Sequence, residues 1–145
     1  MENDPSRKSV LFICIHNSAR SQMAEGFLRE YAGDRLNALS AGLEPTEVHP
    51  LAIEVMREVG IDISGQSSKS LDRYLGKETV HYAIFVCSRA EESCPYVYSL
   101  SLNRLSWPFD DPAALEGTRD ESLEKFREVR DRIDGRIRDW LAGID

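Results

Sequence analysis

One stretch of the sequence decides the fold: VLFICIHNSARS, at residues 10–21. Its first four residues are aliphatic, β-branched or aromatic, which is typical of a strand buried on both faces of a parallel sheet. Beyond a polar loop the apolar period changes, because Met23, Phe27 and Tyr31 fall on one face of a helix. Gly33 stands where a C′ residue would end that helix. The stretch therefore predicts a strand, a loop and a helix in succession.

The rest of the chain repeats this alternation of strands and helices. The elements expected after the first unit are a strand at 36–41, a helix from Pro50 to a stop at Gly60, a short helix at 71–75, a strand at 80–86, a polar loop from Cys87 to Cys94, a strand at 104–109, and a long helix that begins at the capping box Thr118-x-x-Glu121. This order predicts an α/β fold of three layers, in which helices flank a four-stranded parallel sheet. Ligands of such sheets bind beyond the carboxyl ends of the strands.

Length and charge limit the possible functions. At 145 residues the chain is about one domain long, and we expect a flexible segment at 1–8 and a single domain at 9–145. The formal net charge of −7 argues against nucleic-acid binding. No apolar stretch has the length of a membrane span or an export signal, which favours a cytoplasmic protein without a membrane partner. We expect a monomer. Three cysteines are an odd number, and in a reducing compartment they do not indicate a static disulfide framework.

The loop after the first strand is expected to bind an oxyanion. Cys14 and Arg20 are separated by five residues. Backbone N–H groups at a helix start can surround a tetrahedral anion, and a guanidinium adds paired donors. The same positive surroundings should lower the pKa of Cys14 and make its thiolate a nucleophile. The residues expected to bind the substrate are Ile15, His16, Asn17, Ser18, Ala19, Arg20 and Ser21.

Three polar residues of this loop admit more than one interpretation. Asn17 suits a left-handed or otherwise tight backbone position. Ser21 either donates a hydrogen bond to the Cys14 sulfur or caps the helix. His16 is either a base or an exposed loop residue, and an ionised thiol needs no base, which favours the second interpretation.

Two aspartates at the end of the last strand are candidates for a general acid. Asp110 and Asp111 precede Pro112 in a loop that contains aromatic residues. Because Pro112 biases the preceding residue toward extended geometry, Asp111 is the better candidate to protonate a leaving oxygen. The alternative is a solvated aspartate in a turn.

Cys87 and Cys94 lie seven residues apart in a polar segment. Zinc sites use paired short spacings and four ligands, which this chain does not supply, so we predict no zinc site. A polar loop can bring two thiols together, which makes the pair a candidate reversible dithiol. The alternative is two inert thiols.

From Ser9 onward the chain resembles the thioredoxin-coupled arsenate reductases, which are built on the low-molecular-weight tyrosine phosphatase fold. The resemblance rests on residues 14–25, on the separation of Cys87 from Cys94, and on residues 109–113. The phosphatase branch usually has Pro at the position of Gln22 and an aromatic residue at that of Ala113, and it lacks the cysteine pair. These departures favour the reductase branch.

The resemblance implies a mechanism. Cys14 attacks arsenate bound by the loop and Arg20, and Asp111 protonates the departing oxygen. Cys87 then attacks Cys14 and expels arsenite, and Cys94 moves the disulfide to where thioredoxin can reduce it. No cofactor is implied, and residual phosphatase activity is expected because phosphate and arsenate are near-isosteric. The alternatives are a low-molecular-weight protein tyrosine phosphatase and a non-catalytic anion-binding redox module.

Some members of the family bind a potassium ion near the loop. The corresponding residues here are Asn17, Glu25, Ser40, Ser67 and Lys69. Lys69 departs from the pattern because an acid is expected there, and its ammonium can lie beside Glu25 in place of the cation. We therefore predict no metal ion.

Overall fold

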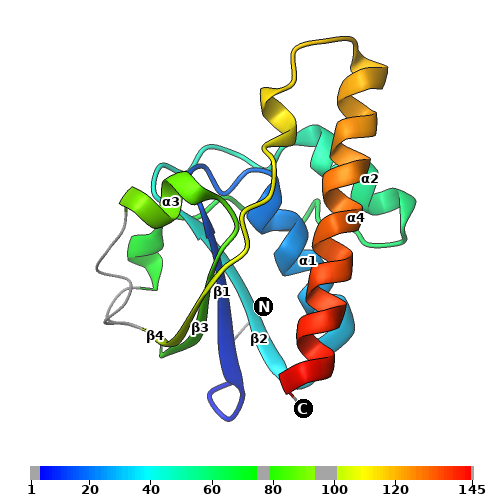
Figure 1. Ribbon diagram of the computed structural model, residues 1–145. Helices are drawn as coiled ribbons and strands as arrows, with labels where there is room; N and C mark the ends of the chain where they lie inside the picture. Colours follow the sequence, from blue (N-terminus) through cyan, green and yellow to red (C-terminus); the bar gives the residue numbers. More distant parts are fainter. Residues whose placement is uncertain (1–3, 75–78, 94–100, 145) are drawn as a thin grey trace.

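The chain forms a four-stranded parallel sheet with strand order β2-β1-β3-β4. The computed structural model describes residues 4–74, 79–93 and 101–144. Its elements are β1 (Lys8–Cys14), α1 (Arg20–Ala32), β2 (Leu36–Gly42), α2 (Pro50–Glu58), the 3-10 helix η1 (Leu71–Arg73), β3 (Val80–Phe85), α3 (Ser88–Ser93), β4 (Ser101–Ser106), the 3-10 helix η3 (Pro112–Ala114) and α4 (Arg119–Ile144) (Figure 1). The predicted α/β fold is confirmed.

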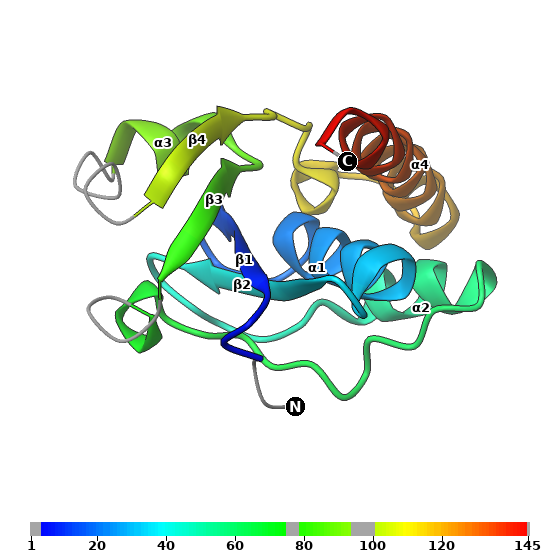
Figure 2. The same ribbon diagram turned by 90° about the horizontal axis from the view of Figure 1, so that it is seen from below.

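Helices lie on both sides of the sheet (Figure 2). One side carries α1, with α2 and α4 packed against it, and the other carries α3 and η1. The core between these layers includes Phe12, Phe27, Phe85 and Phe126, all of them fully buried. Because every strand runs the same way, the residues that follow β1, β3 and β4 meet at one edge of the sheet.

Three predicted boundaries differ from the structure. The last strand lies at Ser101–Ser106 rather than 104–109, since Pro108 has no N–H group to continue the ladder. The polar loop after β3 contains α3, which the sequence does not reveal because Ala90 is its one fully buried apolar residue among those described. Cys94, at the far end of that loop, lies outside the described residues.

The other differences are at helix and strand ends. The expected division between residues 8 and 9 falls inside β1, because Lys8 pairs with Leu36. Gly33 is the C-cap of α1 itself, with a right-handed φ of −62°, and is not the C′ residue. The helix expected at 71–75 is the shorter 3-10 turn η1. Gly60 stops α2 as expected, and its φ of 81° is the left-handed conformation that a residue just after a helix often adopts.

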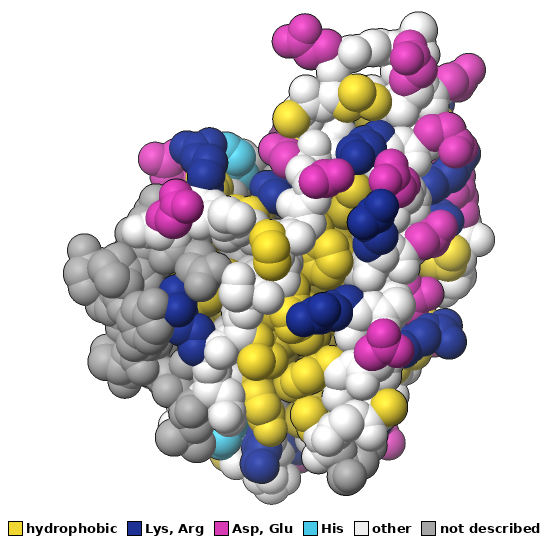
Figure 3. All heavy atoms as spheres, in the orientation of Figure 1, with side chains coloured by type: hydrophobic (Ala, Val, Ile, Leu, Met, Phe, Trp, Pro, Cys, Tyr) yellow, Lys and Arg dark blue, Asp and Glu magenta, His cyan; other side chains and the backbone are white. Residues whose placement is uncertain are grey.

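Aromatic side chains join the long C-terminal helix to the sheet. Trp140 of α4 packs edge-on against Tyr82 of β3 at 5.0 Å and against Trp107 at 5.7 Å. Hydrophobic side chains are visible between β4 and α4 on the face drawn in Figure 3. No helix in the described ranges is long and apolar enough to cross a membrane.

Gly42, at the end of β2, lies in contact with the loop that follows β1. A Cβ atom on Gly42 would lie 2.6 Å from the Ile15 carbonyl oxygen and 2.8 Å from the Asn17 amide nitrogen. Both neighbours are backbone atoms, so no side-chain rotation can relieve the overlap. Glycine is therefore required here for the loop to pack against β2.

We expect Gly42→Ala to lower the free energy of unfolding by about 1–3 kcal/mol, as overpacking does in other close-packed sites, and to weaken phosphate binding. Chemical denaturation and calorimetric titration with phosphate measure the two effects. Gly65→Ala is the matched control, because nothing lies within 4 Å of its added Cβ. Equal stability and phosphate affinity in the two variants would contradict the close approach.

Candidate active site

The loop between β1 and α1 has its backbone carbonyls occupied by donors from elsewhere. The Asn17 carbonyl accepts from Gln22 Nε2 at 3.0 Å. Ser68 Oγ donates to the His16 carbonyl at 2.9 Å, and the Met23 N–H donates to the Ala19 carbonyl at 2.9 Å. The segment after β2 supplies four more contacts: Leu43 N–H to Cys14 O (3.3 Å), Glu44 N–H to Ile15 O (2.8 Å), Thr46 N–H to His16 O (3.2 Å) and His49 N–H to Ser18 O (3.0 Å). With its carbonyls thus paired, the loop keeps its N–H groups for another partner.

Those N–H groups lie at the start of α1. The amides of His16, Ser18, Ala19 and Arg20 have no hydrogen-bond acceptor within the described part of the chain. A run of free N–H groups at a helix N-terminus is the arrangement that binds phosphate-like anions. The loop can therefore surround a tetrahedral oxyanion.

A pocket of about 90 Å³ lies over this loop, and its lining is Cys14, His16, Ser18, Ala19, Arg20, Thr46, Asp111 and Ala113. Five of these residues were expected to bind or attack the substrate, and Asp111 was expected to be the acid. Ile15, Asn17 and Ser21 were also expected there, but they do not line the pocket. Thr46 and Ala113 were missed, because the contact of their loops with the anion site has no local sequence signal.

Asn17 and Ser21 lie beneath the pocket and contact the Cys14 sulfur. Ser21 Oγ is 2.8 Å from Cys14 Sγ, and the Asn17 N–H donates to the same sulfur at 3.1 Å. Asn17 Nδ2 also donates to Ser21 Oγ at 2.8 Å. Asn17 has the predicted left-handed backbone, with φ of 50°. Ser21 is thus the partner of the sulfur and not the helix cap, a position that Ala19 occupies.

The expected low pKa of Cys14 is not what the structure shows. Burial raises the pKa of the Cys14 thiol, and the nearby Cys87 raises it further, whereas Ser21, Arg20 and the Asn17 N–H lower it by less. The thiol is only 4% exposed. The sequence indicates the positive surroundings of the sulfur but not how deeply it is buried, and burial is the larger effect.

Arg20 connects the anion loop to the loop that carries Asp111. Its Nη1 donates to the Phe109 carbonyl at 2.9 Å, and its Nη2 lies 3.8 Å from Asp111 Oδ2. Asp111 also accepts from the Ala113 N–H at 3.0 Å, which fixes the carboxylate at the start of η3. These contacts place Asp111 beside the pocket, as the choice of Asp111 over Asp110 requires.

Asp110 points to α4 instead. Its Oδ2 accepts from Lys125 Nζ at 3.0 Å, and this hydrogen bond holds the pKa of Asp110 below its usual value. A carboxyl that favours its charged form is a poor proton donor. Of the two aspartates, Asp111 is therefore the one whose carboxylate faces the pocket.

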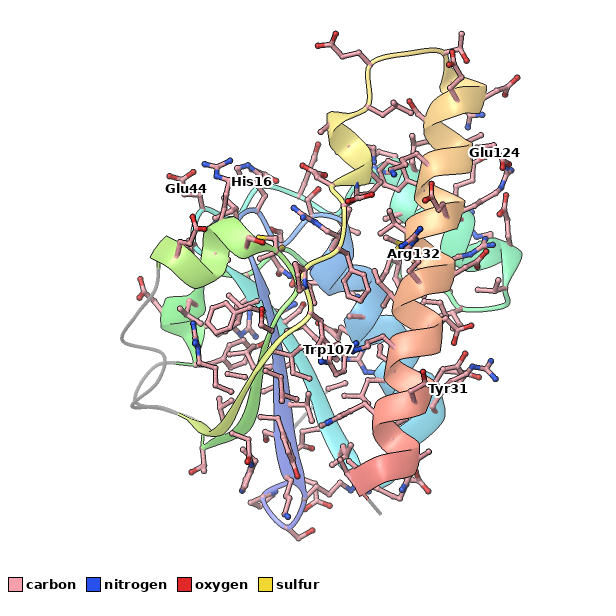
Figure 4. All side chains as sticks on the ribbon, viewed as in Figure 1. His16, Tyr31, Glu44, Trp107, Glu124 and Arg132 are labelled. Atoms are coloured by element: carbon pink, nitrogen blue, oxygen red, sulfur yellow. The ribbon has the colours of Figure 1, made fainter. Side chains whose placement is uncertain are left out.

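His16 is an exposed residue at the pocket rim. It lies beside Glu44 in Figure 4, and its Nδ1 is 3.1 Å from the Glu44 carbonyl oxygen. Because a carbonyl only accepts, Nδ1 carries a proton. Among the contacts of the described residues none joins His16 to Cys14, which agrees with the interpretation of His16 as a loop-surface residue.

Cys87 is the second thiol at this edge of the sheet. It follows β3 as Cys14 ends β1, and these strands are neighbours, with the Val86 N–H donating to the Ile13 carbonyl at 3.0 Å. Cys87 is buried, reduced and 4% exposed. Because Ile13 of β1 pairs with Phe85 of β3, Cys14 and Cys87 follow neighbouring strands at the same edge of the sheet.

A buried ion cluster lies below the loop. Glu25 accepts from Ser40 Oγ at 2.5 Å and Arg29 Nη2 at 2.6 Å, and Lys69 Nζ is 3.4 Å away. The predicted placement of the Lys69 ammonium beside Glu25 is confirmed, and Lys69 Nζ also donates to the Ser67 carbonyl at 2.6 Å. Two cations already neutralise Glu25, so these residues do not fit an additional potassium ion.

Comparisons with known proteins agree with this geometry. The family model of the low molecular weight phosphotyrosine protein phosphatases matches residues 9–145. An arsenate reductase of Halalkalibacterium halodurans is 43% identical, over 92% of this chain and 94% of that protein. An arsenate reductase solved in the phosphate binding state is 36% identical with a TM-score of 0.76, covering 95% of this chain and 99% of that chain. The thioredoxin-dependent arsenate reductase of Corynebacterium glutamicum is also 36% identical, with a TM-score of 0.72, over 95% of this chain and 62% of that chain.

We expect Ser21→Ala to raise the pKa of the Cys14 thiol, because the hydroxyl no longer stabilises the thiolate. The alkylation rate of Cys14 measured against pH should move to higher pH, and a pKa raised by about one would slow the reaction at neutral pH about tenfold. Ser18→Ala serves as the control, since Ser18 lines the pocket without a hydrogen bond to the sulfur. Superimposable profiles for Ser21→Ala and the unmodified protein would rule out this role of Ser21.

Proposed function

This chain belongs to the low molecular weight phosphotyrosine protein phosphatase family, and we propose that within it the protein is an arsenate reductase that takes its electrons from thioredoxin. The observation that carries the proposal is Cys87, a reduced thiol that follows β3 beside Cys14. Hydrolysis of a phosphate ester needs one nucleophile and water, whereas reduction of As(V) to As(III) needs two electrons from a second thiol.

The first step is attack of Cys14 on arsenate bound by the loop amides and Arg20. Because burial raises the pKa of Cys14, the sulfur has to lose a proton on substrate binding. A neutral thiol with an arsenate dianion has the same total charge as a thiolate with a monoanion, so the substrate can take that proton and no separate base is required. Asp111 then protonates the departing oxygen, which leaves as water, and a sulfur–arsenic bond forms.

The second step moves electrons. The thiolate of Cys87 attacks the Cys14 sulfur, the sulfur–arsenic bond breaks, and its electron pair reduces the arsenic to arsenite. The product on the protein is a Cys14–Cys87 disulfide at the buried edge of the sheet. Cys94, which follows α3 in the sequence, attacks Cys87, frees Cys14, and transfers the disulfide to a pair that the dithiol of thioredoxin reduces.

Phosphatase activity is the second candidate function, and the pocket is the observation that favours it. Loop amides, Arg20 and a facing carboxylate would serve phosphate as well as arsenate. We propose that this activity is a residual one, that the protein acts as a monomer in the cytoplasm, where thiols stay reduced, and that its partners are the oxyanion and thioredoxin.

We expect Asp111→Asn to lower kcat for arsenate reduction by about 10² to 10⁴, since no other described carboxyl lines the pocket. Thioredoxin-coupled turnover with arsenate measures the effect. Asp110→Asn is the matched control and should retain kcat near that of the unmodified protein, because its carboxylate is paired with Lys125. A larger loss in Asp110→Asn would assign the acid to that residue instead.

The variants Cys87→Ser and Cys94→Ser should fail at different steps. Cys87→Ser should keep phosphatase activity but release no arsenite, because the part of the chain that the structure describes holds no other thiol to attack Cys14. Cys94→Ser should release about one arsenite per chain in a single turnover and then stop as a Cys14–Cys87 disulfide. Arsenite quantification and mass spectrometry of the trapped protein distinguish the two.

Equal arsenite yields from the two cysteine variants would favour the phosphatase. Repeated thioredoxin-supported turnovers by Cys94→Ser would show that Cys94 does not transfer the disulfide.

A further inference from the structure

His49 connects three parts of the molecule around the pocket. Its backbone N–H donates to the Ser18 carbonyl of the anion loop at 3.0 Å. Its Nδ1 accepts from the Leu51 N–H at 3.1 Å and so caps the N-terminus of α2. Its ring packs against the Phe126 ring of α4, with 4.7 Å between centroids. No sequence pattern predicts a role for this residue.

These contacts define the proton state of the ring. Because Nδ1 accepts a hydrogen bond, the proton of the neutral ring is on Nε2. A proton on Nδ1 would face the Leu51 N–H, remove the cap, and add a positive charge at the N-terminus of α2, where the helix dipole disfavours it. Burial against α4 lowers the pKa of His49, and Asp111 and Glu47 oppose that shift. The neutral ring is therefore the stable form at neutral pH.

The charged side chains near the His49 ring include Asp111, the proposed acid. Among the described residues, Asp111 and, from the segment before α2, Glu47 are the charged groups that raise the pKa of the ring. From α4 the ring meets the apolar Phe126, and Lys125 of the same helix is paired with Asp110. A charged His49 would stabilise the carboxylate form of Asp111 and so oppose the protonated form that acts as an acid.

We propose that His49 is a positioning residue that has to be uncharged for turnover. When neutral, it caps α2, orients the segment that binds the Ser18 carbonyl, and adds no positive charge near Asp111. When protonated, it loses the cap next to the anion loop and adds a positive charge near the acid. The inference rests on the proposed function, since the step that it controls is the departure of the arsenate oxygen.

The first test is the pH profile of kcat/KM for arsenate, each protein being normalised to its own value at pH 7. The unmodified protein should lose about tenfold per pH unit below the pKa of His49. His49→Asn should lack this acidic limb, because asparagine caps a helix equally well and does not titrate. Titration of arsenate contributes equally to both profiles, so their difference isolates the ring. Identical acidic limbs would overturn the proposal.

The second test does not depend on turnover. In nuclear magnetic resonance spectra of the unmodified protein, the chemical shifts of the Ser18 and Leu51 amides should change with pH at the same midpoint as the His49 ring. In His49→Asn these shifts should show no such change. Amide titrations that persist in His49→Asn, or a Ser18 amide that does not respond to the ring, would overturn the proposal. Absence of arsenate reduction in both proteins at every pH would refute the proposed function, and the resonance titration would still decide the role of His49.

Discussion

The site depends on one constraint, the pairing of every carbonyl in the loop after β1. Donors from residues 43–49 and from Gln22, Met23 and Ser68 occupy these oxygens, so the loop cannot turn its carbonyls toward the pocket without losing several hydrogen bonds. The amides then face the one side that lacks acceptors from the described residues. An oxyanion needs only to enter a loop whose geometry is already set, which is the kind of preorganisation that makes electrostatic catalysis effective. Gly42 permits this arrangement, because no larger residue fits between β2 and the loop.

Much of this could be predicted from the sequence, for identifiable reasons. The buried strand, the loop and the helix around Cys14 have strong local patterns, and Pro50, Gly60 and the Thr118–Glu121 capping box mark real helix boundaries. The left-handed backbone of Asn17 follows from its residue type, and the contact of Ser21 with the sulfur is one of the two interpretations that the sequence offers. These features are local, so a single sequence records them.

What the sequence misses depends on contacts between distant segments. The pKa of Cys14 is set by burial beneath the sheet edge, and the contribution of Thr46 and Ala113 to the pocket depends on where their loops return. Pro112 favours Asp111 over Asp110 already in the sequence, but the ion pair that occupies Asp110 comes from Lys125, fifteen residues further along on another element. The helix α3 has too little apolar surface to give a pattern. In each case the tertiary contact outweighs the local preference.

The parallel order of the strands also has a consequence for folding. β1 pairs with β2 on one side and with β3 on the other, and β4 pairs with β3, so each ladder closes over a crossover that contains at least one helix. Nonlocal pairings of this kind are slow steps in the search for the native state. Cys14 and Arg20 lie early in the chain, but Cys87 and Asp111 reach them only when β3 and β4 have joined the sheet. A chain still emerging from the ribosome would carry the proposed nucleophile without the proposed acid or second thiol, so the proposed chemistry would begin only once the whole sheet has formed.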